Sequence, residues 1–474
     1  MTLSTARTPS SPEWFPRMAL LSFLDREHSI AEPDYSRWLV PPAALAIHLC
    51  IGQVYALSVF KIPLSQLIGS GPKAPGNWSQ ETISHLFQIA IVFLGLSAAA
   101  FGAWLERVGP RRAMFTSACC FGGGFIVGAI GIYLHQFWLL ELGYGVLGGI
   151  GLGIGYISPV STLIKWFPDR PGMATGMAIM GFGGGAMIAS PLSVALMNFY
   201  KSGHSQGVTK TFLTMGVLYF LFMMFGVFTV RLPKPGWRPK GFVEPTTGRM
   251  ITRANVSVNE AMRTPQFYLL WVMLCVNVTA GIGVIEQASP MIQEMFPGVI
   301  KASAAAGFVG LLSIANMSGR FLWSSFSDII GRRATYATFF ALGAVLYWCI
   351  PISGHTGKPW LFVLICVVVL TMYGGGFATI PAYLRDMFGT MQVGAIHGRL
   401  LTAWSLAGVL GPLIVNRIRE SQIAGGVAKA DAYTLSMHIM TLLLVIGFLS
   451  NLLVRPVAER HHYRTATEPT GVPT

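Results

Sequence analysis

Charge is scarce in this chain. Of its 474 residues only 11% are Asp, Glu, Lys or Arg, whereas soluble domains carry about 25%. Hydrophobic residues make up 53%, and the mean hydropathy is +0.57. A soluble protein this apolar could not cover its surface with polar groups, and fibrous, disordered and disulfide-framework chains have other compositions. The composition therefore predicts an integral membrane protein.

Groups that carry catalysis or bind metals are also missing. The six cysteines fall within apolar runs rather than in outer loops, and they do not cluster with histidines at metal-ligand spacing. No phosphate-binding loop, nucleotide motif or Ser/His/Asp arrangement stands out. We therefore expect no enzyme, no metal and no cofactor. The first 37 residues lack the apolar core of a signal peptide, so we expect none.

What the sequence has instead is a series of long apolar runs. A membrane helix needs about 20 apolar residues to cross a core about 30 Å thick. Twelve runs approach this length, of which the eighth continues past Arg320 and the eleventh begins before Arg399. The runs are 38–60, 82–105, 113–140, 142–164, 171–200, 211–230, 264–285, 302–319, 334–357, 359–384, 400–416 and 432–454. We expect an all-α membrane protein with twelve transmembrane helices.

The placement of lysine and arginine predicts the orientation. Of the 33 basic residues, 22 fall on the side of both termini, 9 on the other side and two within spans. Because basic loops stay in the cytoplasm, both termini are expected there. The net charge of +14 is then an effect of topology, so we expect no nucleic-acid partner. The chain shows no eukaryotic targeting signal, and we expect a multi-pass protein of a bacterial inner membrane.

The chain also repeats itself. Its longest polar segment, 232–263, separates six spans in 38–231 from six in 264–455, and cytoplasmic tails, expected to be mobile, occupy 1–37 and 456–474. Glycines and prolines recur at one constant spacing across this linker, at Gly109 and Gly331, Pro159 and Pro381, Gly172 and Gly394, and Gly176 and Gly398. We therefore expect two pseudo-symmetric six-helix halves, with a cavity between them near the bilayer midplane.

Two short loops, between spans 2 and 3 and between spans 8 and 9, carry the same motif of an acid, a glycine and arginines. The glycine permits a tight turn, and an acid at the end of one span can pair with an arginine on a neighbouring helix. A simple basic turn would explain the arginines but not the matched acids and glycines. We predict a conformational latch made of Glu106, Arg107, Gly109, Arg111, Arg112, Asp328, Gly331, Arg332 and Arg333.

With these loops, residues 38–455 resemble the major facilitator superfamily, although Pro110, Ser324 and Ile329 depart from its signature. Within this region, shorter stretches of sequence resemble the oxalate/formate antiporter family, a relative of the monocarboxylate transporters. The matching stretches are 52–60, 165–170, 313–320 and 397–404. The resemblance implies the major facilitator fold, transport by alternating access and small organic anions as substrates.

Arg320 is the charge that most needs an explanation. An arginine deep in a membrane helix costs about 2.5–3.5 kcal/mol on insertion scales. If it faces the cavity, its guanidinium can bind a carboxylate through two parallel hydrogen bonds. The alternatives are an ion pair with Glu286 in span 7, or snorkelling to the surface. We favour anion binding, because an arginine in this motif contacts substrate in the family that the chain resembles.

Trp404 predicts how many carboxylates the anion carries. In oxalate-carrying members of that family, the aligned position of span 11 supplies a lysine that binds a second carboxylate. The tryptophan removes that charge and adds an aromatic wall, so we expect a monocarboxylate or a bulkier, partly apolar acid. Other expected wall residues, which could equally be interhelical packing groups, are Tyr55, Asn316, Gln53, Tyr156 and Tyr373.

The coupling ion is left open by the sequence. Glu286 or His397 could carry a proton for symport, with His48 a further candidate, whereas anion exchange needs no titratable group. We expect a monomer in the lipid bilayer whose partners are the anion and either a proton or a counter-anion. The alternative is a carrier of neutral or cationic cargo, such as a sugar or drug, in which Arg320 pairs with Glu286 and is structural. A sensor or channel would need an extra domain or a pore ring, which the sequence lacks.

Overall fold

The computed structural model describes residues 19–68, 76–203, 205–242, 251–252 and 254–463. Within this part of the chain the protein is almost wholly helical. Eleven spans are long and apolar enough to cross a membrane. The twelfth is α11, which has 29 residues and carries the buried Arg320. The prediction of an all-helical protein with twelve membrane helices is confirmed.

Six spans form the N-terminal half. They are Arg37–Leu64, which contains α1 (Val40–Ile51), the 3-10 helix η4 (Gly52–Phe60) and α2 (Lys61–Leu64); α3 (Gln80–Val108); α4 (Pro110–Tyr133); Phe137–Trp166, which contains α5 (Phe137–Leu140), the π-helical η5 (Glu141–Leu147) and α6 (Gly148–Trp166); α7 (Pro171–Tyr200); and α8 (Val208–Thr229). The linker that follows holds the short α9 (Val258–Ala261).

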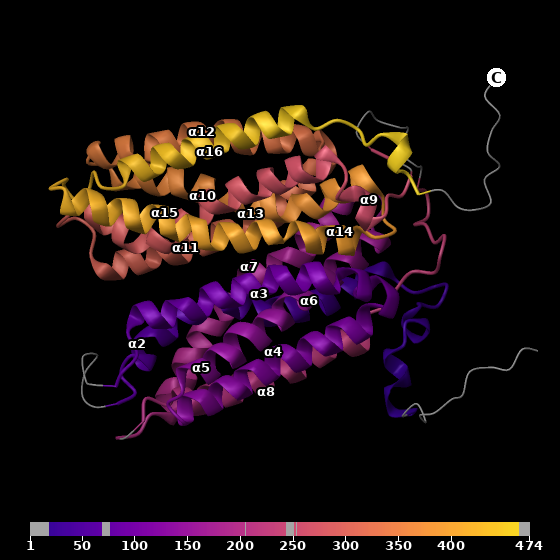
Figure 1. Cartoon of the computed structure of the whole chain (residues 1–474), viewed down its shortest axis with the longest axis horizontal. Coiled ribbons are helices and arrows are strands. Elements are labelled where there is room, and N and C mark those ends of the chain that lie inside the picture. The colour runs from indigo at the N-terminus through magenta and orange to yellow at the C-terminus, as the bar shows by residue number, and fades with distance from the viewer. Residues whose placement is uncertain (1–18, 69–75, 204, 243–250, 253, 464–474) are drawn as a thin grey trace, which may run out of the picture.

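Six further spans form the C-terminal half. They are α10 (Pro265–Met295), α11 (Ala302–Ile330), α12 (Arg332–His355), α13 (Pro359–Phe388), Val393–Ala424, which contains α14 (Val393–Leu400) and α15 (Thr402–Ala424), and α16 (Thr434–Leu453). Figure 1 shows the two halves as separate bundles, with α1 to α8 in indigo to magenta and α10 to α16 in salmon to yellow.

The helices begin and end where local chemistry allows. Ser79 and Thr264 cap α3 and α10 by accepting hydrogen bonds from backbone amides of the first turn. Gly109 and Gly331 separate helix pairs at φ of 87° and 86°, a conformation that favours glycine. The predicted run 113–140 is too long, because α4 ends at Tyr133 and the chain turns at His135 before α5. No charge marks that turn, so the hydropathy pattern misses it.

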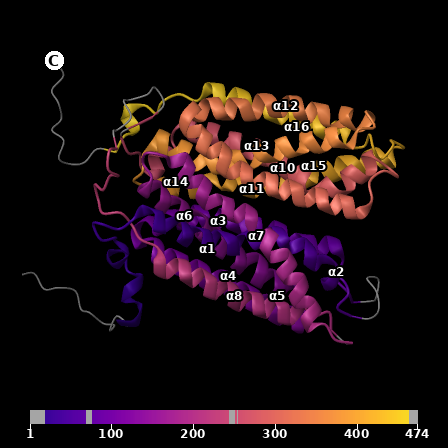
Figure 2. The same ribbon diagram turned by 180° about the vertical axis from the view of Figure 1, so that it is seen from behind.

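The two halves meet along a few helices. In the N-terminal half, α3 and α7 pack against α14, α15 and α11 of the C-terminal half. We call the end of the bundle that holds the linker and the described chain ends the terminal end, and the opposite end the distal end. In Figures 1 and 2 the ribbons of the halves lie close together at the terminal end and diverge toward the distal end.

The tails are more ordered than expected. The backbone of Ala31 and Ser29 pairs with Leu232 at 2.8 and 2.7 Å, and Arg37 forms an ion pair with Asp169 at 2.6 Å. Burial raises the pKa of Asp169, but the hydrogen bonds from Arg37, a backbone hydrogen bond and the charges of Arg37 and Arg170 together outweigh this effect and hold that pKa below its usual value.

The chain after α16 is also ordered. Gln266 donates a hydrogen bond to the Pro456 carbonyl at 3.0 Å, and His461 lies 2.9 Å from Glu260, whose pKa it helps to hold below the usual value. The expectation of mobile tails is wrong for residues 19–36 and 456–463, because these segments make specific polar contacts with the bundle. The rest of both tails lies outside the described residues.

Candidate functional site

The guanidinium of Arg320 lies inside the protein, between the two halves. Its side chain is completely buried. Nε donates to Oδ1 of Asn316 at 3.2 Å, one turn earlier on α11, and Nη1 donates to the Ile179 carbonyl of α7 at 3.3 Å. Nη2 has no hydrogen-bond partner among the described residues. Neutral groups therefore hold the cation, and one edge of it is left without an acceptor.

The ion pair offered as the alternative explanation of Arg320 does not form in this structure. Glu286 lies on the distal part of α10, where its side chain is exposed, and no salt bridge within the described part of the chain includes Arg320. Snorkelling does not occur either, since the side chain has no exposed surface. The charge on Arg320 is therefore not cancelled by an acid of this chain.

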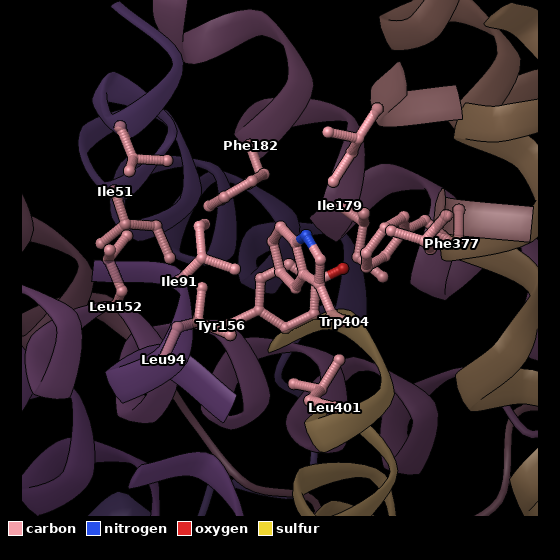
Figure 3. Close-up of a cluster of buried hydrophobic side chains, with 14 of the residues drawn as sticks. Ile51, Ile91, Leu94, Leu152, Tyr156, Ile179, Phe182, Phe377, Leu401 and Trp404 are labelled. Atoms are coloured by element: carbon pink, nitrogen blue, oxygen red, sulfur yellow. The ribbon is translucent and has the colours of Figure 1, made fainter. Parts of the chain in front are cut away.

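Aromatic rings surround this charge. The guanidinium carbon lies 5.5 Å from the ring centres of both Phe182 on α7 and Phe377 on α13, within the range of cation–π attraction. Trp404 packs 5.4 Å from Phe182 and 4.4 Å from Phe377, and Tyr156 lies 5.4 Å from Trp404. Figure 3 shows Tyr156, Phe182, Phe377 and Trp404 converging at the junction of the halves. We call these four residues the aromatic layer.

Glycines make the slot in which the guanidinium lies. A Cβ on Gly183 of α7 would come within 3.0 Å of Arg320 Nε, and one on Gly374 of α13 would come within 3.1 Å of its Cγ. Gly374 also approaches the Asn316 carbonyl so closely that a Cβ would meet it at 2.2 Å. The absence of side chains at these positions lets α7 and α13 close around the arginine.

The other predicted wall residues, apart from Gln53, join this cluster. The ring of Tyr55, on the 3-10 segment η4, lies 5.3 Å from Phe182, and the ring of Tyr373 lies 5.8 Å from Phe377. Tyr156 and Trp404 belong to the aromatic layer itself, and Asn316 contacts Arg320 directly. Each of these residues except Tyr55 is fully or almost fully buried, and Tyr55 is half-buried.

Gln53 points elsewhere. Its side-chain oxygen accepts a hydrogen bond from the Tyr144 hydroxyl at 3.3 Å, and the Tyr144 ring packs on Phe125 in the interior of the N-terminal half. Residue spacing alone does not reveal this direction, because η4 is a 3-10 helix and its side chains do not follow the α-helical period. The geometry therefore does not bring Gln53 to Arg320.

The cluster is rich in donors that lack acceptors. Within the described part of the chain, no hydrogen-bond partner is found for Arg320 Nη2, Trp404 Nε1 or the hydroxyls of Tyr55, Tyr156 and Tyr373. Guanidinium and indole groups only donate, and the hydroxyls also have a proton to give. A buried polar group without a partner costs about 1–3 kcal/mol. A ligand that supplies several acceptor oxygens would satisfy them together.

Sequence reasoning missed Phe182, Phe377 and the Ile179 carbonyl. The internal repeat holds a signal for the first of these, since Phe182 and Trp404 are separated by the spacing of the repeat and their rings meet in the aromatic layer. The positions are equivalent in the two halves. No comparable signal marks Phe377, which follows the glycine run 374–376.

The two predicted latch acids bind the opposite half. Oε1 of Glu106 on α3 accepts from the Gly394 amide at the start of α14 at 3.1 Å and from Ser161 at 2.8 Å, while Oε2 pairs with Lys165 at 2.6 Å. Asp328 on α11 accepts from the Gly172 and Met173 amides at the start of α7, both at 2.8 Å, and pairs with Arg332. Carboxylates are favoured at helix N-termini.

These contacts are equivalent in the two repeats. Glu106 and Asp328 occupy equivalent positions of the two halves, as do Gly172 and Gly394, so each half caps the equivalent helix of the other. Arg332 reinforces one side by bonding to Asp386 at 3.0 Å. The expectation that an acid pairs with an arginine of a neighbouring helix is wrong for Glu106, whose cation is Lys165, because the helix start supplies an amide where we expected a guanidinium.

The remaining latch arginines make other contacts. Arg111 and Arg112 bind the tail at the Phe23 carbonyl and at Asp25, and Arg333 donates to the Leu452 carbonyl at 2.6 Å. Arg107 is exposed. Arg399, the second arginine within a span, reaches Asn259 at 3.3 Å near the terminal end and does not enter the Arg320 cluster. His397 is buried near Tyr156, with a distance of 5.8 Å between the ring centres.

Comparisons with known proteins agree with this architecture. The Major Facilitator Superfamily profile matches residues 43–412. An uncharacterised transporter of this type from Escherichia coli, YhjX, is 27% identical over 79% of this chain and 86% of its own length. The oxalate:formate antiporter of Oxalobacter formigenes is 24% identical over 79% of this chain and 83% of its own length. Apicoplast pyruvate carrier 1 of Toxoplasma gondii is 25% identical over 79% of this chain and 75% of its own length.

Solved structures share the fold. The transporter FucP in its outward conformation superposes with a TM-score of 0.61 at 13% identity, over 87% of this chain and 98% of its own. At this identity the likeness concerns the arrangement of the helices alone.

Proposed function

This chain belongs to the Major Facilitator Superfamily, and on that basis we propose that it is a secondary transporter of small organic anions, most of all monocarboxylates, that works by alternating access. The observation that carries the proposal is the buried Arg320 guanidinium without an acid, surrounded by hydroxyl and indole donors without acceptors. A carboxylate carries the opposite charge and offers about four acceptor positions on two oxygens.

The shape of the cluster favours one carboxylate over two. The guanidinium offers a single cationic edge at Nη2, and the wall beside it consists of Phe182, Phe377 and Trp404 rather than a second cation. An acid with a small apolar body satisfies both features. Two relatives support small carboxylic acids as substrates, since their names give oxalate and formate, and pyruvate. Formate and pyruvate carry one carboxylate, whereas oxalate carries two.

The conformation of the latch supports alternating access. Both acids hold the halves together at the terminal end, while the ribbons separate toward the distal end (Figure 1). We propose that the terminal end faces the cytoplasm of a bacterial cell, so that this structure represents an outward-facing state of an inner-membrane carrier. Release of Glu106 and Asp328 from the starts of α14 and α7 would then open the cytoplasmic side.

Transport of the anion can be coupled in two ways. In anion exchange, the unneutralised Arg320 would hinder the empty carrier from reorienting, so that one anion leaves only when another binds. In proton symport, a titratable group would carry a proton with the anion. A carrier of neutral or cationic cargo has less support, because the ion pair between Arg320 and Glu286 that it requires does not form here.

A counterflow experiment tests this function. The purified protein is placed in liposomes loaded with an unlabelled acid, and entry of labelled formate, lactate, pyruvate, oxalate and a sugar is followed. We expect counterflow of monocarboxylates and not of the sugar. Replacing Arg320 with Gln should reduce it at least about tenfold, since a hydrogen bond to a charged group contributes about 1.5–3 kcal/mol.

The matched control for that experiment is Arg399→Gln. Arg399 is also an arginine within a span, but its contact with Asn259 places it outside the cluster. We expect this variant to transport like the wild type. Full anion counterflow in Arg320→Gln, or counterflow of the sugar alone, would overturn the proposed function.

A further inference from the structure

Two buried histidines contact the aromatic layer. His48 on α1 and His397 on α14 come from different halves and contact the same ring, that of Tyr156, at centre-to-centre distances of 5.3 and 5.8 Å. Both imidazoles are almost completely buried. His397 lies two turns of helix, about 10 Å, before Trp404 and shortly after Gly394, which Glu106 holds. His397 therefore sits between the anion cluster and the latch, whereas His48 lies level with the cluster, since a Cβ on Gly181, next to Phe182, would meet the His48 Cβ at 3.2 Å.

Most ring nitrogens of this pair lack a hydrogen-bond partner among the described residues. His48 Nδ1 lies 3.1 Å from the Ala44 carbonyl, which can only accept, so the neutral ring carries its proton at Nδ1. Its Nε2, both ring nitrogens of His397 and the Tyr156 hydroxyl have no hydrogen-bond partner among the described residues. Purely structural histidines usually satisfy such buried atoms. This pair offers ring nitrogens that can accept a proton beside one shared ring, that of Tyr156.

The charged groups around the pair are few. Arg320 interacts electrostatically with His48, and the two imidazoles interact with each other. Tyr156 interacts with Arg320 and with Tyr55. On the neighbouring helices α3 and α13, the carboxylates Glu106 and Asp386 are paired with Lys165 and Arg332 near the terminal end. The positive charge that opposes protonation of the pair is therefore that of Arg320.

We propose that His48 and His397 together form a proton-binding site that is filled when a carboxylate neutralises Arg320, so that the anion and one proton cross the membrane together. This inference rests on the proposed function, whose coupling it specifies. Before the anion binds, Arg320 repels a second positive charge nearby. The bound carboxylate cancels that repulsion, and by linkage the proton in turn strengthens anion binding.

The route of the proton follows from the same geometry. A proton from water on the distal side would reach a ring nitrogen by way of the Tyr55 and Tyr156 hydroxyls. It would leave on the terminal side once α14 separates from Glu106, because His397 lies near the start of that helix. The proton comes from a hydronium ion of the distal water, each tyrosine hydroxyl exchanges one O–H bond for another, and the N–H bond that forms on the imidazole breaks again on the terminal side.

Coupled and uncoupled transport can be separated in liposomes. The membrane potential is clamped to zero, and accumulation of labelled formate, lactate and pyruvate is driven by a medium more acidic than the lumen. We expect the wild type to accumulate an anion. In His48→Gln and His397→Gln, the ratio of acid-driven accumulation to counterflow should fall at least tenfold. The matched control is His85→Gln, an exposed histidine at the start of α3, in which this ratio should equal that of the wild type.

A second measurement does not depend on the folding of any variant. Purified wild-type protein in weakly buffered detergent solution, with a pH indicator present, should take up about one proton for each anion that it binds. Wild-type counterflow without this proton uptake and without acid-driven accumulation would overturn the histidine site but leave the proposed function intact. Full acid-driven accumulation in both histidine variants would also overturn it. Absence of all anion counterflow in the wild type would instead refute the proposed function.

Discussion

Arg320 and Ala98 occupy equivalent positions of the two halves, separated by the spacing of the internal repeat. Each lies where a glycine of the opposite half crosses closely, since a Cβ on Gly176 would come within 3.0 Å of the Arg320 carbonyl and one on Gly398 within 2.2 Å of the Ala98 carbonyl. The backbone is thus nearly symmetric while the charge is not. This asymmetry gives the carrier one cationic group in its centre, which suits an anion with one negative charge.

At the same scale, Trp404 should decide between one and two carboxylates. Trp404→Lys places an ammonium beside Phe182 and Phe377, close enough to the cluster to bind a second carboxylate. We expect the ratio of oxalate to lactate counterflow to rise at least about tenfold, which corresponds to about 1.4 kcal/mol. Trp404→Phe should keep the preference for the monocarboxylate. An unchanged ratio in the lysine variant would contradict this assignment of the aromatic layer.

At the scale of elements, the latch acts on two helix starts. A carboxylate near a helix N-terminus contributes about 0.3–1 kcal/mol when exposed and up to about 2 kcal/mol when partly buried. The double variant Glu106→Gln, Asp328→Asn removes both charges and keeps the shapes. We expect the population to shift from the state closed at the terminal end toward the opposite state.

That shift can be measured between the distal ends of the halves. Spin labels at Phe199→Cys and Val299→Cys, both exposed positions, would be used with Cys119, Cys120 and Cys349 changed to serine. Double electron–electron resonance spectroscopy should show a new population of shorter distances between the two spin labels in the latch variant. The unaltered latch with the same labels provides the reference, and identical distributions would mean that the acids do not hold this conformation.

The elements themselves were largely predictable. Twelve apolar runs gave twelve helices because a membrane span must bury its own backbone polar groups, and a long apolar helix is the simplest way to do so. Helix ends were less predictable. The turn at His135 lies within an apolar run, and the last turns of α10 and α11 continue past Glu286 and Asp328 because acids are tolerated where they find amides, cations or solvent.

The site was predictable only in part. An isolated arginine in a span is conspicuous. Of the residues in the family-like stretches, Asn316 bonds to it, and Trp404 packs on Phe377, one of the rings that flank it. The direction of Gln53 and the contribution of Phe377 depend on helix rotation and on the 3-10 geometry of η4, which hydropathy does not encode.

At the scale of the whole molecule, we propose that the terminal end of the bundle faces the cytoplasm. A fluorescent protein fused after the last residue should be bright in bacterial cells, while alkaline phosphatase fused at the same place should be inactive, because each folds on only one side of the membrane. The loop after Tyr200, at the distal end, should give the opposite pair of results. If the fusion after the last residue showed phosphatase activity and no fluorescence, and the fusion in the loop after Tyr200 showed the reverse, the proposed orientation would be wrong.

The central claim is that the Arg320 guanidinium binds the carboxylate of the substrate, and equilibrium binding tests it without the complications of transport. Labelled formate, lactate and pyruvate would be titrated onto purified wild type, Arg320→Lys, Arg320→Gln and the control Arg399→Gln in a scintillation proximity assay. We predict that Arg320→Gln raises the Kd of the bound acid at least about tenfold, that Arg320→Lys is intermediate because a point charge replaces a planar fork, and that Arg399→Gln binds like the wild type. Equal affinity in the wild type and Arg320→Gln would contradict the account.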